Sequence, residues 1–334
     1  MNKNSGIQAM RALACSLVIL QHATYFACDA KGIPFGRYLP VDLGQIGVGI
    51  FFVISGYVMG LCMTQGRRFL WNRAARIYPP FWIAILISAA IFLRPGDGWH
   101  FDLKSAFLVP SSAINTTYRI PFWTLCYEMA FYCAVYLMIL AGITRKQVQM
   151  ICLVWISAIA LFNIYHADAT MQWLFLGQPG KWILLSPYSV FFVIGLLFWA
   201  SDVALPESPA LLLAASIALW LIAYSVKFSI GATGFMLMAV SFCCLLAAVL
   251  RAQFGSAITW IGDASYGAYL IHIAVIVAVE TRLKAYADHL SLFEIWLILL
   301  AAGSTAGFLY GWVESKAHKK FLAGLFWRSR GLAR

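Results

Sequence analysis

Residues 43–63 read LGQIGVGIFFVISGYVMGLCM, a run without a single charged side chain. A helix that crosses a bilayer needs about 20 mostly apolar residues, so this stretch predicts a transmembrane segment. The whole chain has the same character, because 62% of its 334 residues are hydrophobic and 11% are charged. A soluble domain carries about 25% charged residues. A chain this apolar could not cover its surface in water, so we predict an integral membrane protein.

The same length criterion predicts ten spans along the chain. They cover residues 7–27, 43–63, 78–93, 121–141, 148–165, 182–200, 209–226, 231–250, 264–281 and 292–312. The fold class expected from this pattern is all-α, a polytopic bundle of about ten transmembrane helices. We expect a single integral membrane domain over residues 1–334, with a basic cytoplasmic tail at about 315–334. Arg11 and His22 interrupt the first apolar run, so we expect it to be retained and not cleaved as a signal peptide.

The distribution of charge predicts the orientation of these spans. In a soluble protein, a net charge of +11 would indicate a nucleic-acid partner. Here the basic residues cluster in short segments between apolar runs, and the densest clusters, at 67–76 and 315–334, become cytoplasmic when both termini do. We therefore expect cytoplasmic termini and no nucleic-acid partner. The eight cysteines show no metal-ligand spacing, and we expect no metal site.

Ionisable side chains inside the predicted spans indicate where function lies, because they are costly there and usually face a bundle interior or an aqueous cavity. Arg11 and His22 are eleven residues apart, which places them on nearly the same helix face about 16 Å apart. Glu128 should reach a depth similar to that of His22. A carboxylate beside an imidazole fixes its tautomer and raises its basicity, as a general base requires. The structural alternatives are that Arg11 reaches lipid head groups, His22 bonds a neighbouring helix and Glu128 pairs elsewhere.

Four arginines follow the second predicted span, and they are Arg67, Arg68, Arg73 and Arg76. They could act only as topogenic charges in a cytoplasmic loop. They could also clamp the phosphates of coenzyme A, since arginine binds phosphate bidentately.

Further candidates are polar residues on otherwise apolar helices. Ser265, Tyr269 and His272 follow an i, i+4, i+7 spacing and form one polar stripe. We interpret His272 as a hydrogen-bonded interior histidine in preference to a catalyst, while Tyr269 and Ser265 could line a substrate channel. Other candidates for the substrate site or for an oxyanion donor are Tyr132, Tyr127, Tyr57 and Ser55.

Five motifs occur in order along the chain. They are IQAMRALA at 7–14 with the Arg-x10-His pair, GVGIFFVISGY at 47–57, RAARIYP at 73–79, FWTLCYE at 122–128, and GDASYGAYLIH at 262–272 before Val313-Glu314. This series resembles the membrane-bound acyltransferase-3 family, the O-acyltransferases of bacterial surface polysaccharides, and within it the ExoZ-like exopolysaccharide branch.

The resemblance implies about ten spans in the bacterial inner membrane and an acyl-CoA donor, usually acetyl-CoA, that acts as a co-substrate and is not permanently bound. It implies a catalytic role for Arg11 and His22, with Glu128 also implicated. Many members carry Asp just before the Phe-Phe of the second span, where this chain has Gly49-Ile50. Glu128 would then support His22 alone.

We therefore expect an O-acyltransferase that moves an acetyl-type group to a hydroxyl of an exopolysaccharide, another surface glycan or a lipid-linked precursor. Arg73 and Arg76 would hold the donor, and His22 would take the hydroxyl proton or become acylated itself. The expected partners are acyl-CoA, the glycan, the bilayer and the polysaccharide synthesis machinery. One alternative is an exporter with a proton relay, although no inverted repeat is evident. Another is a non-catalytic partner of a polysaccharide synthase.

Overall fold

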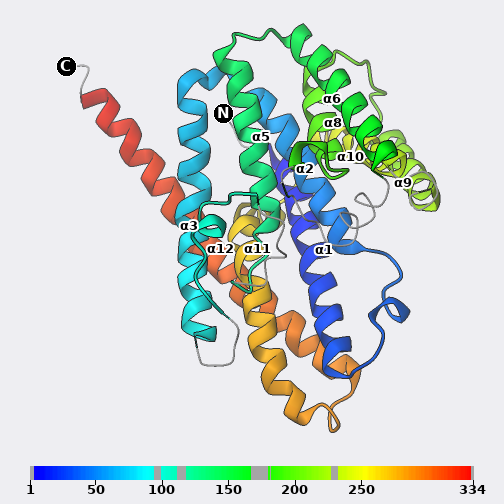
Figure 1. Cartoon of the computed structure of the whole chain (residues 1–334), viewed down its shortest axis with the longest axis vertical. Coiled ribbons are helices and arrows are strands. Elements are labelled where there is room, and N and C mark those ends of the chain that lie inside the picture. The colour runs from blue at the N-terminus through cyan, green and yellow to red at the C-terminus, as the bar shows by residue number, and fades with distance from the viewer. Residues whose placement is uncertain are drawn as a thin grey trace.

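The computed structural model describes residues 4–93, 99–110, 118–166, 180, 182–226 and 232–331, with side chains described up to residue 320 apart from residues 226 and 232. All regular elements in this part of the chain are helices (Figure 1). They are α1 (Ser5–Ala30), η1 (Phe35–Arg37), α2 (Leu43–Cys62), η2 (Met63–Arg68), α3 (Phe69–Phe92), α4 (Leu103–Ala106), α5 (Trp123–Leu140), α6 (Arg145–Tyr165), η3 (Ile183–Leu185), α8 (Ser189–Ala200), α9 (Pro209–Val226), α10 (Ala232–Leu250), α11 (Ser256–Leu283), η4 (Lys284–Tyr286) and α12 (Leu292–Gly331).

The described helices confirm a multi-pass, all-helical membrane protein. Seven of them are long and apolar enough to cross a bilayer, and one of these is the continuous run Leu43–Phe92, which contains two of the predicted spans. Two shorter apolar helices, Ser189–Ala200 and Pro209–Ser225, fall on two further predicted spans. The number ten and the orientation of the termini remain predictions. Most of the predicted basic tail continues α12 as far as Gly331, and residues 332–334 lie outside the described part.

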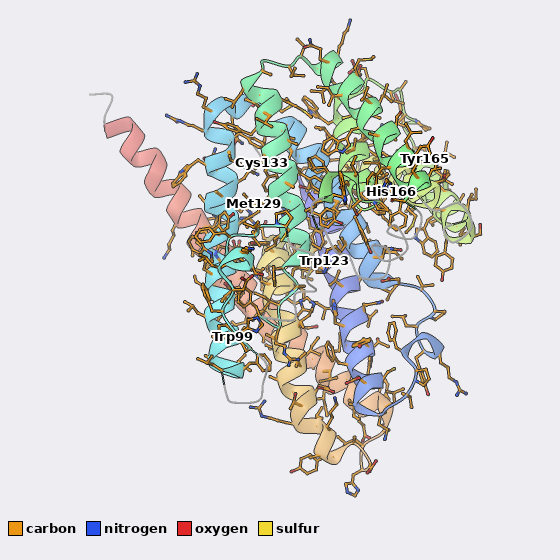
Figure 2. All side chains as sticks on the ribbon, in the orientation of Figure 1. Trp99, Trp123, Met129, Cys133, Tyr165 and His166 are labelled. Atoms are coloured by element: carbon orange, nitrogen blue, oxygen red, sulfur yellow. The ribbon has the colours of Figure 1, made fainter. Side chains whose placement is uncertain are left out.

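The surface suits a lipid environment. Large apolar and aromatic side chains are exposed on it, and Tyr165 at the end of α6 is 80% exposed. Figure 2 shows this residue at one side of the molecule, and Trp123, Met129 and Cys133 along α5. Apolar side chains on the outside of a helix bundle are stable in lipid, where they would not be stable in water.

One predicted span is longer than the helix that forms there. Residues 182–200 were expected to be one helix, but α8 begins only at Ser189. The residue before Pro187 is Ser186, whose ψ of 146° is extended. Proline disfavours the helical conformation in the residue that precedes it, so the backbone breaks at this point.

Another predicted span is shorter than its helix. The prediction began at residue 78, beside Pro79-Pro80, whereas α3 begins at Phe69 and contains both prolines. Prolines are tolerated within membrane helices when neighbouring helices supply hydrogen bonds to the backbone around them. The Tyr266 hydroxyl donates to Ile77 O at 3.0 Å, and the Tyr310 hydroxyl donates to Pro80 O at 2.6 Å. The extra turns of α3 carry Arg73 and Arg76, which were expected in a loop.

Helix α1 occupies the middle of the bundle and packs against α2, α10, α11 and α12 (Figure 1). Its first turn is capped by Asn4, whose side chain accepts from Gly6 N at 2.9 Å. Small residues allow the surrounding helices to approach closely. A Cβ at Gly195 of α8 would overlap the carbonyl of Val53 on α2, so this contact requires glycine. The polar side chains of α1 are therefore held between several helices.

Candidate active site

A cavity of about 370 Å³ lies among α1, α2, α3, α5, α10 and α11. Small-molecule sites commonly occupy about 300–1,000 Å³. Eight of the residues predicted from sequence line this cavity, and they are Arg11, Ser55, Tyr57, Arg73, Arg76, Glu128, Tyr132 and Tyr269. Residues that are more than 250 positions apart in the chain thus meet in one place.

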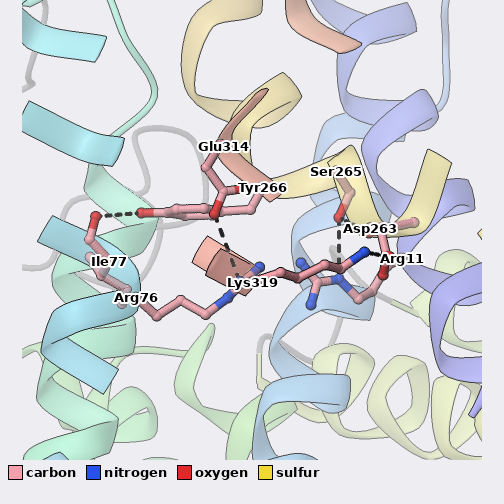
Figure 3. Close-up of polar contacts among 9 residues, drawn as sticks. Arg11, Arg76, Ile77, Asp263, Ser265, Tyr266, Glu314 and Lys319 are labelled. Carbon is pink, nitrogen blue, oxygen red and sulfur yellow. Dashed lines mark hydrogen bonds and ion pairs between the residues drawn. The ribbon is translucent and has the colours of Figure 1, made fainter. Parts of the chain in front are cut away.

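The charged lining of the cavity consists of three arginines and one carboxylate. Arg11 donates through Nε to Ser265 Oγ at 3.2 Å, which anchors it to α11 (Figure 3). Arg73 and Arg76 lie one turn apart on α3, and Nε of Arg73 has no hydrogen-bond partner among the described residues. A cavity with this excess of positive charge attracts anions.

Arg76 is held from two sides by α11 and α12. Its guanidinium carbon lies 5.7 Å from the centre of the Tyr266 ring, and Nη1 lies 3.7 Å from a carboxylate oxygen of Glu314 (Figure 3). The Glu314 side chain is only 4% exposed. The ion pair between Arg76 and Glu314 joins α3 to α12. The arginine is thereby fixed in direction at the cavity wall.

Glu128 lies in the cavity with the arginines. Its carboxylate accepts from the Tyr132 hydroxyl at 2.8 Å, one turn further along α5. The register of α5 follows from a hydrogen bond of 2.7 Å between the Thr124 and Tyr269 hydroxyls. Glu128 lies four residues beyond Thr124, about 6 Å along the helix axis. That distance places it at the level of Arg11.

His22 and His272 form a pair on α1 and α11. Nε2 of His272 lies 3.1 Å from Nδ1 of His22, and the ring centres are 5.1 Å apart. His272 is fully buried, and His22 is partly buried. The Tyr269 ring lies 5.9 Å from the His272 ring and also lines the cavity. Tyr269 therefore connects the cavity wall with His272.

The predicted pairing of His22 with Glu128 is not found among the described residues. The hydrogen bonds of His22 go to Val18 O and His272, and that of Glu128 to Tyr132. The depth of Glu128 was estimated from a span beginning at residue 121. The helix begins at Trp123 instead, after residues 118–122, most of which are buried inside the protein. Glu128 consequently lines the cavity with the arginines, while His22 contacts His272.

Four other predicted residues lie outside the cavity lining, and one of them, Ser265, holds Arg11 from α11. Arg67 and Arg68 are exposed in η2, outside the lining of the cavity. Tyr127 is buried and donates to Ser186 Oγ at 2.7 Å, on the side of α5 that faces η3 and α8. The four arginines therefore do not form one cluster.

Three polar residues of the lining that were not predicted lie one helical turn from a predicted residue. Gln8 is one turn before Arg11 on α1, Thr124 is one turn before Glu128 on α5, and Tyr266 is one turn before Tyr269 on α11. Helical spacing from the predicted residues could have found all three. Among the described residues, no three His, Cys, Asp or Glu side chains are grouped so that they could hold a metal ion.

Comparison with known proteins places the chain in a family. Residues 4–312 match the acyltransferase 3 family, whose description is an acyltransferase domain. The chain is 33% identical over 103 residues to the exopolysaccharide production protein ExoZ of Rhizobium meliloti (strain 1021), covering 27% of this chain and 32% of ExoZ. It is 31% identical over 169 residues to the putative membrane-bound transacylase BcsY of Komagataeibacter xylinus. These residues are 44% of this chain and 40% of BcsY.

A third relative is the acyltransferase MdmB of Streptomyces mycarofaciens, 28% identical over 142 residues, which are 38% of this chain and 36% of MdmB. The matched segments thus span between a third and two-fifths of these relatives. No solved structure matches the chain. Because the family match covers nearly the whole length, the chain belongs to the acyltransferase 3 family of membrane-bound acyltransferases.

Proposed function

We propose that the chain transfers an acyl group, most simply acetyl from acetyl-CoA, to a hydroxyl of an exopolysaccharide or another cell-surface glycan or its lipid-linked precursor. The observation that carries this proposal is the arginine-lined cavity beside the imidazole pair. The names of two relatives support the same function, since one is an exopolysaccharide production protein and the other a putative membrane-bound transacylase.

The cavity suits the phosphate-bearing donor. Arg73 and Arg76 present guanidinium groups from one face of α3, and Arg11 presents a third from α1. Guanidinium groups bind phosphate oxygens through paired, charge-assisted hydrogen bonds. Glu128 and Glu314 offset part of this charge, so the arginines are stable without a ligand. In this proposal the thioester end of the donor extends past Tyr269 towards His22.

In this reaction one proton moves from the sugar hydroxyl to His22 and then to the leaving thiolate. Nε2 of His22 removes the proton of the sugar hydroxyl as its oxygen forms a bond to the thioester carbon. The carbon–sulfur bond then breaks, and the thiolate of coenzyme A takes the proton back from His22. The Tyr269 hydroxyl is placed to donate to the carbonyl oxygen while that oxygen carries negative charge. No covalent intermediate on the protein is required.

The proposal includes a location and partners. The arginine-rich end faces the cytoplasm, where acyl-CoA is made, and the imidazole pair lies towards the opposite face, where the glycan acceptor arrives. The membrane would be the bacterial inner membrane, with the polysaccharide synthesis machinery as a partner. This arrangement follows the positive-inside bias of the basic segments.

The test is acyl transfer by purified protein in nanodiscs. Radiolabelled acetyl-CoA is supplied with a panel of oligosaccharides, and wild type is compared with His22→Asn. We expect label on a sugar with wild type only, and the accepting sugar identifies the substrate. Folded wild-type protein that neither transfers nor binds any of several acyl-CoA donors would contradict the proposal and favour the exporter.

A further inference from the structure

Backbone carbonyls of α11 fix the position of the imidazole hydrogen of His272. Its Nδ1 lies 2.8 Å from Tyr269 O and 3.2 Å from Ala268 O. Carbonyl oxygens only accept hydrogen bonds, so Nδ1 must carry the hydrogen. The backbone of α11 therefore determines the tautomer of this imidazole. In its neutral form, Nε2 of His272 has a lone pair and can only accept.

The same reasoning applies to His22. Its Nδ1 lies 2.9 Å from Val18 O and 3.1 Å from Nε2 of His272, and both of these atoms are acceptors. Nδ1 of His22 therefore carries a hydrogen and shares it between them. A hydrogen on Nε2 of His272 would point at the hydrogen on Nδ1 of His22. The arrangement therefore requires His272 to be neutral. The lone pair of neutral His22 is then on Nε2, on the opposite side of the ring.

This hydrogen bond persists when His22 gains a proton. The incoming proton binds Nε2, and Nδ1 continues to donate to His272. The donor is now an imidazolium, and hydrogen bonds from charged donors are about twice as strong as those between neutral groups. An interaction that strengthens as the proton is transferred lowers the barrier to transfer.

We propose that His272 is a positioning residue for catalysis, because the hydrogen bond from Nδ1 of His22 to Nε2 of His272 aims the base and stabilises its protonated form. The inference rests on the proposed function and deepens it. It gives the imidazole on α11 the role that sequence analysis assigned to Glu128. Asp42, at the start of α2, is engaged in capping that helix, where its side chain accepts from Gln45 N at 2.8 Å.

The kinetic test compares two replacements of His272. His272→Gln keeps an acceptor oxygen near the position of Nε2, and His272→Leu removes it at similar size. We expect kcat to fall roughly ten-fold or more in the leucine variant, the difference between a charged and a neutral hydrogen bond. The glutamine variant should retain most of the wild-type kcat. The KM for acyl-CoA should stay unchanged in both, because His272 is not part of the cavity lining.

A matched control lies on the same helix. Thr281→Val removes a polar group whose hydroxyl donates to Val277 O at 2.8 Å, and it should leave kcat unchanged. A folded His272→Leu protein with wild-type kcat would overturn the proposal. A glutamine variant as slow as the leucine variant would also overturn it, since the acceptor would not be what His272 supplies.

A spectroscopic test does not depend on turnover. In protein labelled with 15N-histidine, we expect a coupling across the hydrogen bond between Nδ1 of His22 and Nε2 of His272. Spectra of His22→Asn and His272→Leu assign the two signals among the six histidines. A protonated Nε2 on His272, or no coupling, would refute the pair even in an active enzyme. An inactive wild type that shows the coupling would instead count against the proposed function.

Discussion

At the scale of single residues, the four arginines after α2 separate into two pairs. Arg73 and Arg76 line the cavity, while Arg67 and Arg68 are exposed in η2. If the cavity binds the phosphates of the donor, Arg73→Ala and Arg76→Ala should each raise the KM for acyl-CoA roughly ten- to hundred-fold, the size expected for lost charge-assisted hydrogen bonds. Steady-state kinetics with a fixed saturating acceptor measures this change.

The exposed pair provides the matched control for that experiment. Arg67→Ala and Arg68→Ala remove the same charge from the same segment of chain, and the KM should change by less than about two-fold, as expected for exposed charges. An equal rise of KM in all four variants would show that the arginines act through general positive charge and not through contacts in the cavity.

Glu128 yields a separate prediction because its neighbours are arginines and Tyr132. Glu128→Gln keeps an acceptor for Tyr132 but removes the carboxylate that offsets the positive charge of the cavity. The free energy of unfolding should fall by about 1–3 kcal/mol, visible as a lower Tm. The kcat should fall far less than in His22→Asn. An unchanged Tm together with a kcat as low as that of His22→Asn would restore the predicted His22–Glu128 pair.

The candidate residues could be found from sequence because charged and polar groups are rare in apolar spans. Their pairing could not be found. The distance between Glu128 and His22 depends on where α5 begins, and a shift of one turn is enough to change the partner. That start depends on the burial of Phe122 and the bond from Thr124 to Tyr269, which are tertiary contacts.

At the scale of elements, α3 shows what local sequence rules omit. Pro79 and Pro80 predict the start of a helix, since proline is favoured in a first turn and costly later. The hydroxyls of Tyr266 and Tyr310 donate to the backbone at this point from α11 and α12. These contacts support the helix around the prolines, so α3 can begin at Phe69. The position of Arg73 and Arg76 in the cavity follows from that extension.

The contact between α2 and α8 gives a prediction on stability. A Cβ at Gly195 would overlap the carbonyl of Val53, a backbone atom that cannot rotate away. Gly195→Ala should therefore destabilise the protein by about 1–3 kcal/mol, as overpacking does. Gly36→Ala in η1 is the control, because a Cβ there meets no atom within 4 Å. Thermal unfolding in detergent of both variants measures the difference, and equal Tm values would contradict the close contact.

At the scale of the whole molecule, class and approximate helix positions followed from composition and from the length of the apolar runs. The cavity did not, because it is built from six helices whose packing no single segment specifies. Three of its lining residues, Asn4, Leu61 and Leu250, lie at helix ends next to basic segments. The histidines lie along α1 and α11 towards their other ends, which are together at the bottom of Figure 1.

This polarity makes a prediction about sidedness. The donor should enter at the arginine-rich end, which the positive-inside bias places in the cytoplasm. In sealed vesicles of defined orientation that enclose the acceptor, labelled acyl-CoA added outside should be used by inside-out vesicles and not by right-side-out vesicles. Detergent should equalise the two preparations, because it opens both faces to the donor. Transfer in intact right-side-out vesicles alone would show that the bundle has the opposite orientation. The arginines would then lie away from the cytoplasmic supply of donor.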